Sequence, residues 1–227
     1  MPAAAFSNRE LSTKEQILLT AERLIADHGV DGVSMRQIGA AVGSGNNSAV
    51  LYHFGSKEKL VEAIFEYRLP RLRERRAELI AGRRPSDLRG WLECQIVVVL
   101  EQSELDDSSY LSFVASLSQH GGEAFKHLPR RFARGQRDYE DQLRACLTSV
   151  DEPLRTHRLA QVMEMTVQAA ANRERARARR RPVLSLALES ANLVDCMVGY
   201  LEAPVSPASH AALEQASATV FRQTLFV

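Results

Sequence analysis

The stretch from Ser34 to Lys57 constrains the fold of this chain more than any other part of it. Ser34 can cap a helix, and Gln37, three residues later, completes a capping box with it. Gly43 and Gly45 then interrupt the helical pattern, because glycine favours the turn that follows a helix. The stretch therefore predicts a short helix, a glycine-containing turn and a second short helix.

The second of these helices has two dissimilar faces. Val50 and Phe54 are four residues apart, so both can dock on the helix before them. The opposite face carries small polar residues, one leucine and one tyrosine: Asn47, Ser48, Leu51 and Tyr52. Two helices joined by a short turn, with a polar face left exposed on the second, form the layout of a helix-turn-helix that enters the major groove of DNA. We interpret the stretch as a DNA-binding motif.

The exposed face suits contact with base edges. Asparagine pairs bidentately with adenine, so Asn47 is a candidate base contact, and Leu51 can touch a thymine methyl group. Asn46 next to it is also a candidate helix cap. Since this helix has no arginine or lysine, other residues must meet the phosphate charge, and Arg36 and Lys57 are the first candidates.

Bulk properties are compatible with this interpretation without supporting it. A chain of 227 residues can form one large or two small domains. Its formal net charge of +1 counts mildly against DNA binding, since most DNA-binding domains carry an excess of positive charge. The N-terminal sequence does not resemble a signal peptide, and the chain has no apolar run long enough to cross a membrane. We expect a soluble, cytoplasmic protein that does not associate with membranes.

Apolar residues recur at helical spacing along nearly the whole chain, and strand-like alternation is absent. Ser12 and Ser56 are candidate caps for the helices on either side of the motif. Pro70 falls inside the helix that begins after Ser56, and we predict that this helix kinks or restarts there and that Pro70 marks a joint. The fold class is expected to be all-α. An N-terminal three-helix helix-turn-helix domain (1–56) should precede a C-terminal helical effector and dimerisation domain (57–227).

Two groups of arginines are expected to be solvated helix surfaces, the alternative being nucleic-acid patches. The first lies between residues 173 and 181 and contains six arginines and Glu174 but no aromatic residue for base stacking. The second follows the DNA-binding motif and comprises Arg68, Arg71, Arg73, Arg75, Arg76, Arg83 and Arg84. The three cysteines are too widely spaced for a metal cluster, and we expect Cys94, Cys146 and Cys196 to be buried small apolar residues.

The block from Thr13 to Phe65 resembles the DNA-binding domain of TetR-type transcriptional repressors. The resemblance rests on the first helix ending in His28-Gly29, on the helix after Ser34, and on Tyr52-His53-Phe54 followed by Ser56-Lys57-Glu58. It implies that the third helix enters the major groove and that Tyr52, His53 and Lys57 touch the DNA backbone. Here the turn before that helix is one residue longer, with Gly45 where the family has a buried valine. The predicted DNA contacts are Ser34, Arg36, Asn46, Asn47, Ser48, Leu51, Tyr52, His53 and Lys57.

The rest of the chain is similar to the family's variable ligand-binding and dimerisation domain in length and helix count. Aromatic residues and methionine with a few polar anchors suit a small lipophilic effector, although such a stripe is more often simple core. The candidate pocket residues are Trp91, Gln95, Phe113, Gln136, Tyr139, Met163 and Gln168.

The segment from 184 to 201 is apolar nearly all round and should be buried on more than one side. We predict a homodimer in which this helix and the helix from 159 to 170 pack on their symmetry mates, the alternative being a helix wholly central to one subunit. The predicted interface residues are Leu159, Met163, Leu188, Val194, Met197, Val198 and Leu201.

Two classes of function compete at this point. In the first, the chain is a ligand-responsive repressor that binds a palindromic double-stranded DNA operator as a dimer. In the second, it is an all-α enzyme or sequestering protein with a DNA-binding-like N-terminus. Common catalytic, nucleotide-binding and metal-binding motifs are absent from the sequence, which disfavours catalysis. No cofactor and no metal are expected.

Overall fold

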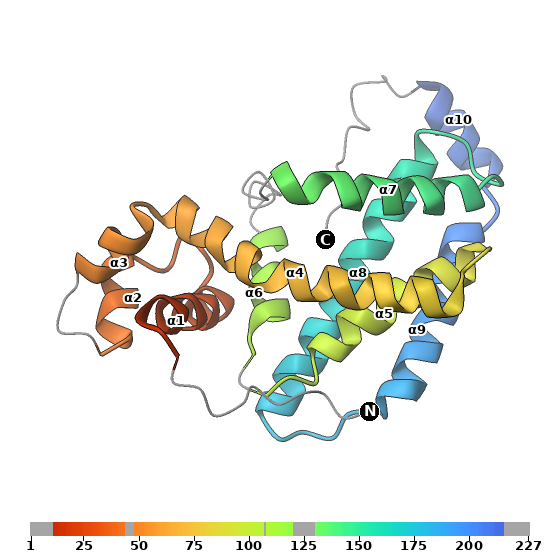
Figure 1. Cartoon of the computed structure of the whole chain (residues 1–227). Coiled ribbons are helices and arrows are strands. Elements are labelled where there is room, and N and C mark those ends of the chain that lie inside the picture. Colours follow the sequence, from red (N-terminus) through yellow and green to blue (C-terminus); the bar gives the residue numbers. More distant parts are fainter. Residues whose placement is uncertain (1–10, 44–47, 107, 120–129, 216–227) are drawn as a thin grey trace.

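The computed structural model describes residues 11–43, 48–106, 108–119 and 130–215, and every regular element in these ranges is a helix (Figure 1). The expected all-α fold class is confirmed. The first four helices are α1 (Thr13–His28), α2 (Met35–Ala41), α3 (Ser48–Phe54) and α4 (Lys57–Arg83). They are followed by α5 (Leu88–Gln102), α6 (Tyr110–Gln119), α7 (Arg130–Cys146), α8 (Leu154–Ala178), α9 (Leu186–Glu202) and α10 (Pro207–Gln215).

Three of the first four helices begin at the serine caps expected from the sequence. The Ser12 hydroxyl accepts a hydrogen bond from the Glu15 backbone N–H at 3.3 Å, and the Glu15 carboxylate accepts one from the Ser12 N–H at 2.9 Å. Ser34 forms the same capping box with Gln37, and Ser56 caps α4. These bonds satisfy N–H groups that have no partner within the helix, so the helix starts are set locally.

The helices form two regions that share one apolar core. In Figure 1, α1, α2, α3 and the first turns of α4 lie at one end, and the remaining helices make up the larger part of the molecule. Buried side chains connect the two parts through α6, where the Phe65 ring of α4 lies 5.6 Å from the Phe113 ring and 6.3 Å from the Tyr110 ring, centroid to centroid. The two regions are therefore held together by aromatic packing as well as by the covalent chain.

Pro70 does not end its helix, because α4 continues through it to Arg83. Figure 1 shows the axis of α4 bending before the helix runs beside α5, as expected for a proline that removes one backbone hydrogen bond. Pro70 is exposed, so the bend does not bury the proline ring. Of the two predicted outcomes, a kink and a restart, the structure has the kink.

The arginine group on α4 is a solvated face only in part: Arg71, Arg83 and Arg84 are exposed as expected, and the expectation is wrong for the others. Arg68 and Arg76 are buried, and Arg75 forms two hydrogen bonds with the Glu101 carboxylate of α5, at 2.8 and 2.9 Å. Arg83 pairs with Glu93 at 2.7 Å. Carboxylates on neighbouring helices pair with Arg68, Arg75 and Arg83, so these three arginines link α4 to α1 and α5.

The most buried of these pairs joins α1 to α4. The guanidinium of Arg68 donates to the Glu22 carboxylate through Nε at 2.7 Å and Nη2 at 2.8 Å, and the two side chains are 7% and 2% exposed. Burial alone opposes the charged form of Arg68, but the hydrogen bonds and charge of Glu22 hold its pKa above the usual value. Glu22 also accepts a hydrogen bond from the Ser109 N–H at 3.0 Å, so this carboxylate joins α1, α4 and the start of α6.

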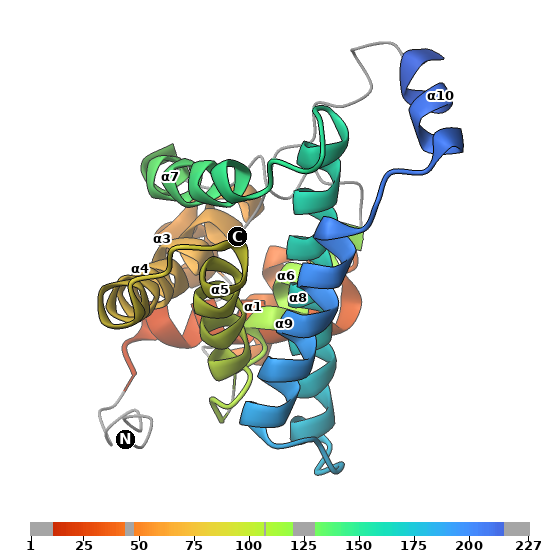
Figure 2. The ribbon, with the colours of Figure 1, turned by 90° about the vertical axis from the view of Figure 1, so that its right-hand side faces the viewer.

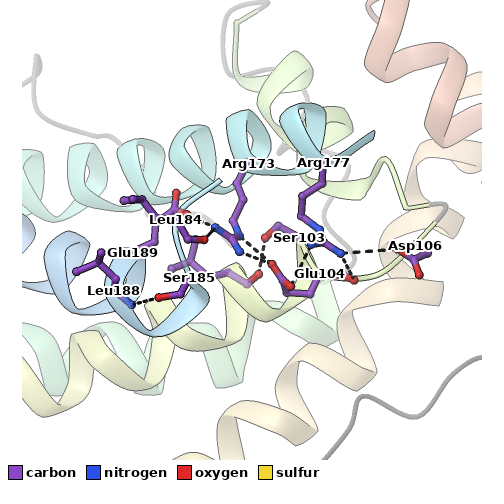
Figure 3. A network of polar contacts seen from close by, with 10 residues as sticks. Ser103, Glu104, Asp106, Arg173, Arg177, Leu184, Ser185, Leu188 and Glu189 are labelled. Atoms are coloured by element: carbon purple, nitrogen blue, oxygen red, sulfur yellow. Dashed lines mark hydrogen bonds and ion pairs between the residues drawn. The ribbon is translucent and has the colours of Figure 1, made fainter. Parts of the chain in front are cut away.

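The arginine group between residues 173 and 181 also differs from the expectation. Figure 3 shows Arg173 of α8 between two other parts of the chain. Its side chain is 3% exposed, donates to Glu104 at 2.6 and 2.9 Å, and pairs with Glu189 of α9. It also donates to the Leu184 carbonyl at 2.7 Å. Only the last three arginines of the group are exposed: Arg179, Arg180 and Arg181.

The C-terminal helices pack in a layer in which α8 and α9 lie side by side (Figure 2). α9 also packs on α5, and α10 has no buried residue. The cysteines are not uniformly buried as expected: Cys94 is buried, Cys146 is half-buried and Cys196 is exposed on α9. Across the described residues, no helix combines the length and the apolar character needed to span a membrane.

The buried pair gives the first prediction. Replacing Arg68 with methionine leaves the Glu22 carboxylate buried without its counter-charge, and we expect a loss of about 3–5 kcal/mol in the free energy of unfolding. The matched variant Arg75→Met removes a half-exposed pair from the same helix and should cost at most about 1 kcal/mol. Urea unfolding followed by circular dichroism measures both, and equal losses would contradict the assignment.

Candidate nucleic-acid interface

The helix pair expected from the sequence is present in α2 and α3. Ile38 of α2 is fully buried, and Val50 and Phe54 of α3 are 0% and 6% exposed. The predicted docking face of α3 is therefore confirmed. Gly55, with φ of 74°, makes the turn from α3 into α4, a backbone conformation that side-chain-bearing residues rarely adopt.

The opposite face of α3 is open to solvent. Leu51 is 52% exposed and Tyr52 is 86% exposed, the largest exposed fraction among the large apolar side chains in the described part of the chain. His53 is also exposed and packs edge-to-face against Tyr52, with ring centroids 5.4 Å apart. Asn46, Asn47 and the side chain of Ser48 lie outside the described residues. The described face thus offers one leucine and two ring systems to a partner.

Two predicted contacts sit on α2 and its cap. The Ser34 hydroxyl accepts from the Gln37 N–H at 3.2 Å and donates to the Gln37 side-chain oxygen at 2.7 Å. Its hydrogen-bonding capacity is thus largely used within the chain, so Ser34 acts first as a helix cap. Arg36, two residues further on, is exposed and has its guanidinium available for a phosphate.

Lys57 has a structural contact that the sequence did not indicate. Its ammonium group donates to the carbonyl of Val30 at 2.9 Å, which ties the start of α4 to the turn between α1 and α2. An ammonium group has three N–H donors, so two remain for other acceptors. Lys14 of α1 lies over the Phe54 ring at 5.9 Å, which places a second positive charge beside α3.

The predicted pocket residues do not all come together. Trp91, Gln95 and Tyr139 meet between α5 and α7, where the Tyr139 hydroxyl donates to the Trp91 carbonyl at 2.8 Å. Phe113 belongs instead to the aromatic contact with α4. Met163 is buried in α8, while Gln168 is half-exposed and bonds Asn172 on the same helix at 3.1 Å. The side chain of Gln136 lies outside the described part of the chain.

Sequence reasoning missed a buried cation in this cluster. The guanidinium of Arg76 donates to the Gln95 side-chain oxygen at 2.9 Å and lies 4.8 Å from the centre of the Tyr139 ring. Burial lowers the pKa of Arg76. The spacing Phe65, Leu69, Leu72 and Arg76 follows one face of a helix, and that periodicity was the available indication that Arg76 points inward.

Most of the predicted dimer residues are buried within the single chain, which corrects their assignment. α9 packs on α5 and α8 through its apolar face, and a side chain already buried there has no surface to offer a second subunit. The residues concerned are Leu201 (0% exposed), Leu159 (1%), Val194 (2%), Met163 (3%) and Met197 (6%). Of the remaining two, Leu188 is 55% exposed and Val198 is half-buried.

The helix pair and its surroundings match a known family. Residues 17–64 match the model for bacterial regulatory proteins of the tetR family. This segment of the chain is therefore similar to regulatory proteins of the tetR family. The matched residues run from Ile17 in α1 to Ile64 in α4 and so include the whole of α2 and α3.

Curated relatives agree with the family model over the same part of the chain. The HTH-type transcriptional repressor AcnR of Corynebacterium efficiens is 34% identical over 62 residues, which make up 27% of this chain and 32% of that protein. The protein of the same name from Corynebacterium diphtheriae is 38% identical over 73 residues, 32% of this chain and 38% of its own length. This chain thus spans about a third of the length of these relatives.

The likeness extends further in the fold. The crystal structure of a transcriptional regulator from Rhodococcus sp. Rha1 superimposes with a TM-score of 0.52 at 18% sequence identity. The match covers 84% of this chain and 96% of the other. It therefore extends well beyond the DNA-binding motif and shows a shared helical architecture.

The hydrogen bonds of Ser34 give a second prediction. Ser34→Ala removes the cap of α2 and should lower the free energy of unfolding by about 1 kcal/mol. Ser34→Asp keeps an oxygen acceptor for the Gln37 N–H and should recover most of that loss, as measured by urea unfolding. If alanine and aspartate were equally destabilising, the hydroxyl would not be acting as a cap.

Proposed function

We propose that this chain is a DNA-binding transcriptional regulator of the tetR family, most simply a repressor, that reads its operator with α3. The observation that carries the proposal is the exposed face of α3, with Leu51 and Tyr52 directed away from a docking face that is fully packed. Exposed large side chains on the second helix of a helix-turn-helix are typical of a surface that contacts a partner.

In this proposal some side chains on and around α3 contact bases and others contact phosphates. Leu51, with Asn47 and Ser48, meets base edges in the major groove. Tyr52, His53, Arg36 and Lys57 meet the phosphates on either side and set the register of the helix. The bond of Lys57 to the Val30 carbonyl holds its amine in place at the start of α4, so less side-chain freedom is lost when the amine meets a phosphate.

The lysine at the start of α4 supplies the test. Purified protein should bind a fragment of the DNA upstream of its own reading frame, and Lys57→Ala should weaken binding to all sequences alike. Loss of one phosphate contact should also reduce the slope of log affinity against log salt by about 0.9. Lys59→Ala removes an exposed lysine two residues further along the same helix and is the matched control.

Fluorescence anisotropy over a range of salt concentrations measures both variants. A changed preference between two operator sequences, with the salt slope kept, would contradict a phosphate contact. Failure of the wild-type protein to prefer any fragment over random DNA would contradict the proposed function itself.

A palindromic operator calls for a dimer, and we propose that the exposed strip of α8 and α9 forms it. Leu188 of α9 and Met165 of α8 are large apolar side chains that remain 55% and 36% exposed in the single chain. The two helices lie side by side, which allows both residues to contribute to one dimer contact (Figure 2). A twofold axis through this surface buries the same strip of both subunits.

Two charged substitutions test the dimer. Leu188→Glu combined with Met165→Glu places charges on the proposed contact without touching the core, and should convert a particle of about twice 25.3 kDa into a monomer. Leu51→Glu exposes the same charge on α3 and should remain a dimer. Light scattering at micromolar concentration measures the mass, and a dimeric double variant would contradict this surface.

We further propose a division of labour in which residues 1–56 read DNA and residues 57–227 bind a small effector and the second subunit. The support is the cluster of Trp91, Gln95 and Tyr139, in which a half-buried indole and buried polar groups meet beside α4. A ligand that displaces the Gln95 contact to Arg76 acts directly on α4, the helix that begins beside α3.

A further inference from the structure

A groove of about 980 Å³ lies between the two regions, away from α2 and α3. One wall is α1, through residues that include Thr20 and Arg23, and the other is the end of α8 with the loop that follows it. Further lining residues come from between α5 and α6: Ser103, Leu105, Asp106, Ser108 and Ser109. Its size is within the range of small-molecule sites, and none of its lining residues belongs to the cluster around Trp91.

Positive charge dominates among the described residues that line the groove. Four arginines face two carboxylates, and both carboxylates are already engaged. Glu174 accepts the backbone N–H groups of Leu111 and Ser112 at 3.2 and 2.9 Å, and the side chain of Asp106 is 97% exposed at the rim. Of the four arginines, Arg177 pairs with Glu104 at 3.3 Å and with Asp106 at 3.7 Å.

The other three guanidinium groups, on Arg23, Arg180 and Arg181, have no hydrogen bond or ion pair within the part of the chain that the structure describes. This contrasts with Arg68, Arg75, Arg83 and Arg173, which all pair with carboxylates. Like charges gathered around one concave surface repel each other, and an anion between them relieves that repulsion.

The backbone holds two of these arginines in place. At the end of α8 the Arg180 N–H bonds the Arg177 carbonyl at 2.8 Å and the Arg181 N–H bonds the Ala176 carbonyl at 2.8 Å, with Arg180 at φ of 53°. These bonds turn the chain back at the helix terminus. Arg173 fixes the continuation of the same loop through the Leu184 carbonyl (Figure 3). The charges are therefore presented by a fixed turn, which lowers the entropy cost of binding.

We infer that this groove binds a small polyanion, one carrying phosphate or carboxylate groups, between α1 and the end of α8. Guanidinium groups donate paired N–H bonds that match both kinds of oxyanion. The hydroxyls of Thr20 and Ser108 add neutral donors to the lining. If the chain reads DNA as proposed above, an anion that bridges these two segments biases the position of α1, on which α2 packs.

The test is isothermal titration calorimetry of the full-length protein at fixed ionic strength, with pyrophosphate and with succinate as probes. We expect saturable binding of at least one probe at one site per chain; which probe binds more tightly identifies phosphate or carboxylate as the preferred chemistry. The double variant Arg180→Asn, Arg181→Gln should weaken binding by about tenfold or more. Asparagine is chosen at 180 because it tolerates a left-handed backbone.

A charge-matched control is available elsewhere in the chain. Arg84→Asn with Arg179→Gln removes the same number of charges, again with asparagine at a left-handed helix end, and neither residue lines the groove. It should bind the probe within about twofold of the wild-type protein, because only long-range charge changes. Equal binding by wild type and the groove variant, or an absence of saturable binding by the wild type, would overturn the inference.

The same arginines meet DNA in the competing explanation. In that case the groove variant, without any added anion, would lose affinity for DNA of every sequence and show a flatter salt dependence than the control, and the small-anion site would be rejected. The calorimetric measurement contains no DNA. A failure of DNA recognition and a failure of the anion site can therefore be told apart.

Discussion

The buried pair between Glu22 and Arg68 is the interaction on which the arrangement of the two regions depends. An ion pair this deep is stable only where additional hydrogen bonds satisfy the remaining oxygens, and the Ser109 N–H supplies one. The same carboxylate thereby fixes α1, the bend region of α4 and the start of α6 relative to each other. Tyr110 beside it is fully buried, and burial raises its pKa, as expected in such a low-dielectric environment. The helix pair α2 and α3 packs on α1 and α4, the two helices that this cluster holds together.

Local chemistry explains which parts of the fold could be predicted from the sequence. The caps at Ser12, Ser34 and Ser56 each depend on residues three positions away, and the docking of Val50 and Phe54 depends on helical periodicity. The arginines could not be placed in this way. The partner of Arg68 lies 46 residues earlier and that of Arg173 lies 69 residues earlier, so only the packing of distant helices decides whether they are buried or solvated.

In the candidate site, too, the features set by nearby residues could be predicted and those set by distant residues could not. The exposure of Leu51 and Tyr52 follows from the face opposite Val50, whereas the bond from Lys57 to the Val30 carbonyl spans 27 residues and has no pattern in the sequence. For α9, composition alone does not predict which side chains are buried. A helix that is apolar nearly all round indicates burial on two sides, but which side meets its own chain depends on how it sits against α5 and α8. Val194 and Leu188 differ in exposure for that reason alone.

The start of α6 carries a consequence for protein engineering. Its backbone N–H groups are met by Glu22 from α1 and by Glu174 from α8, so the two regions together cap one helix. A chimera that grafts the first 56 residues of another regulator onto this chain would have to retain an acceptor at position 22 for both Arg68 and Ser109. The DNA-binding segment can therefore be exchanged only if Glu22 is kept. A graft joined at the turn before Lys57 has to leave this one residue unchanged.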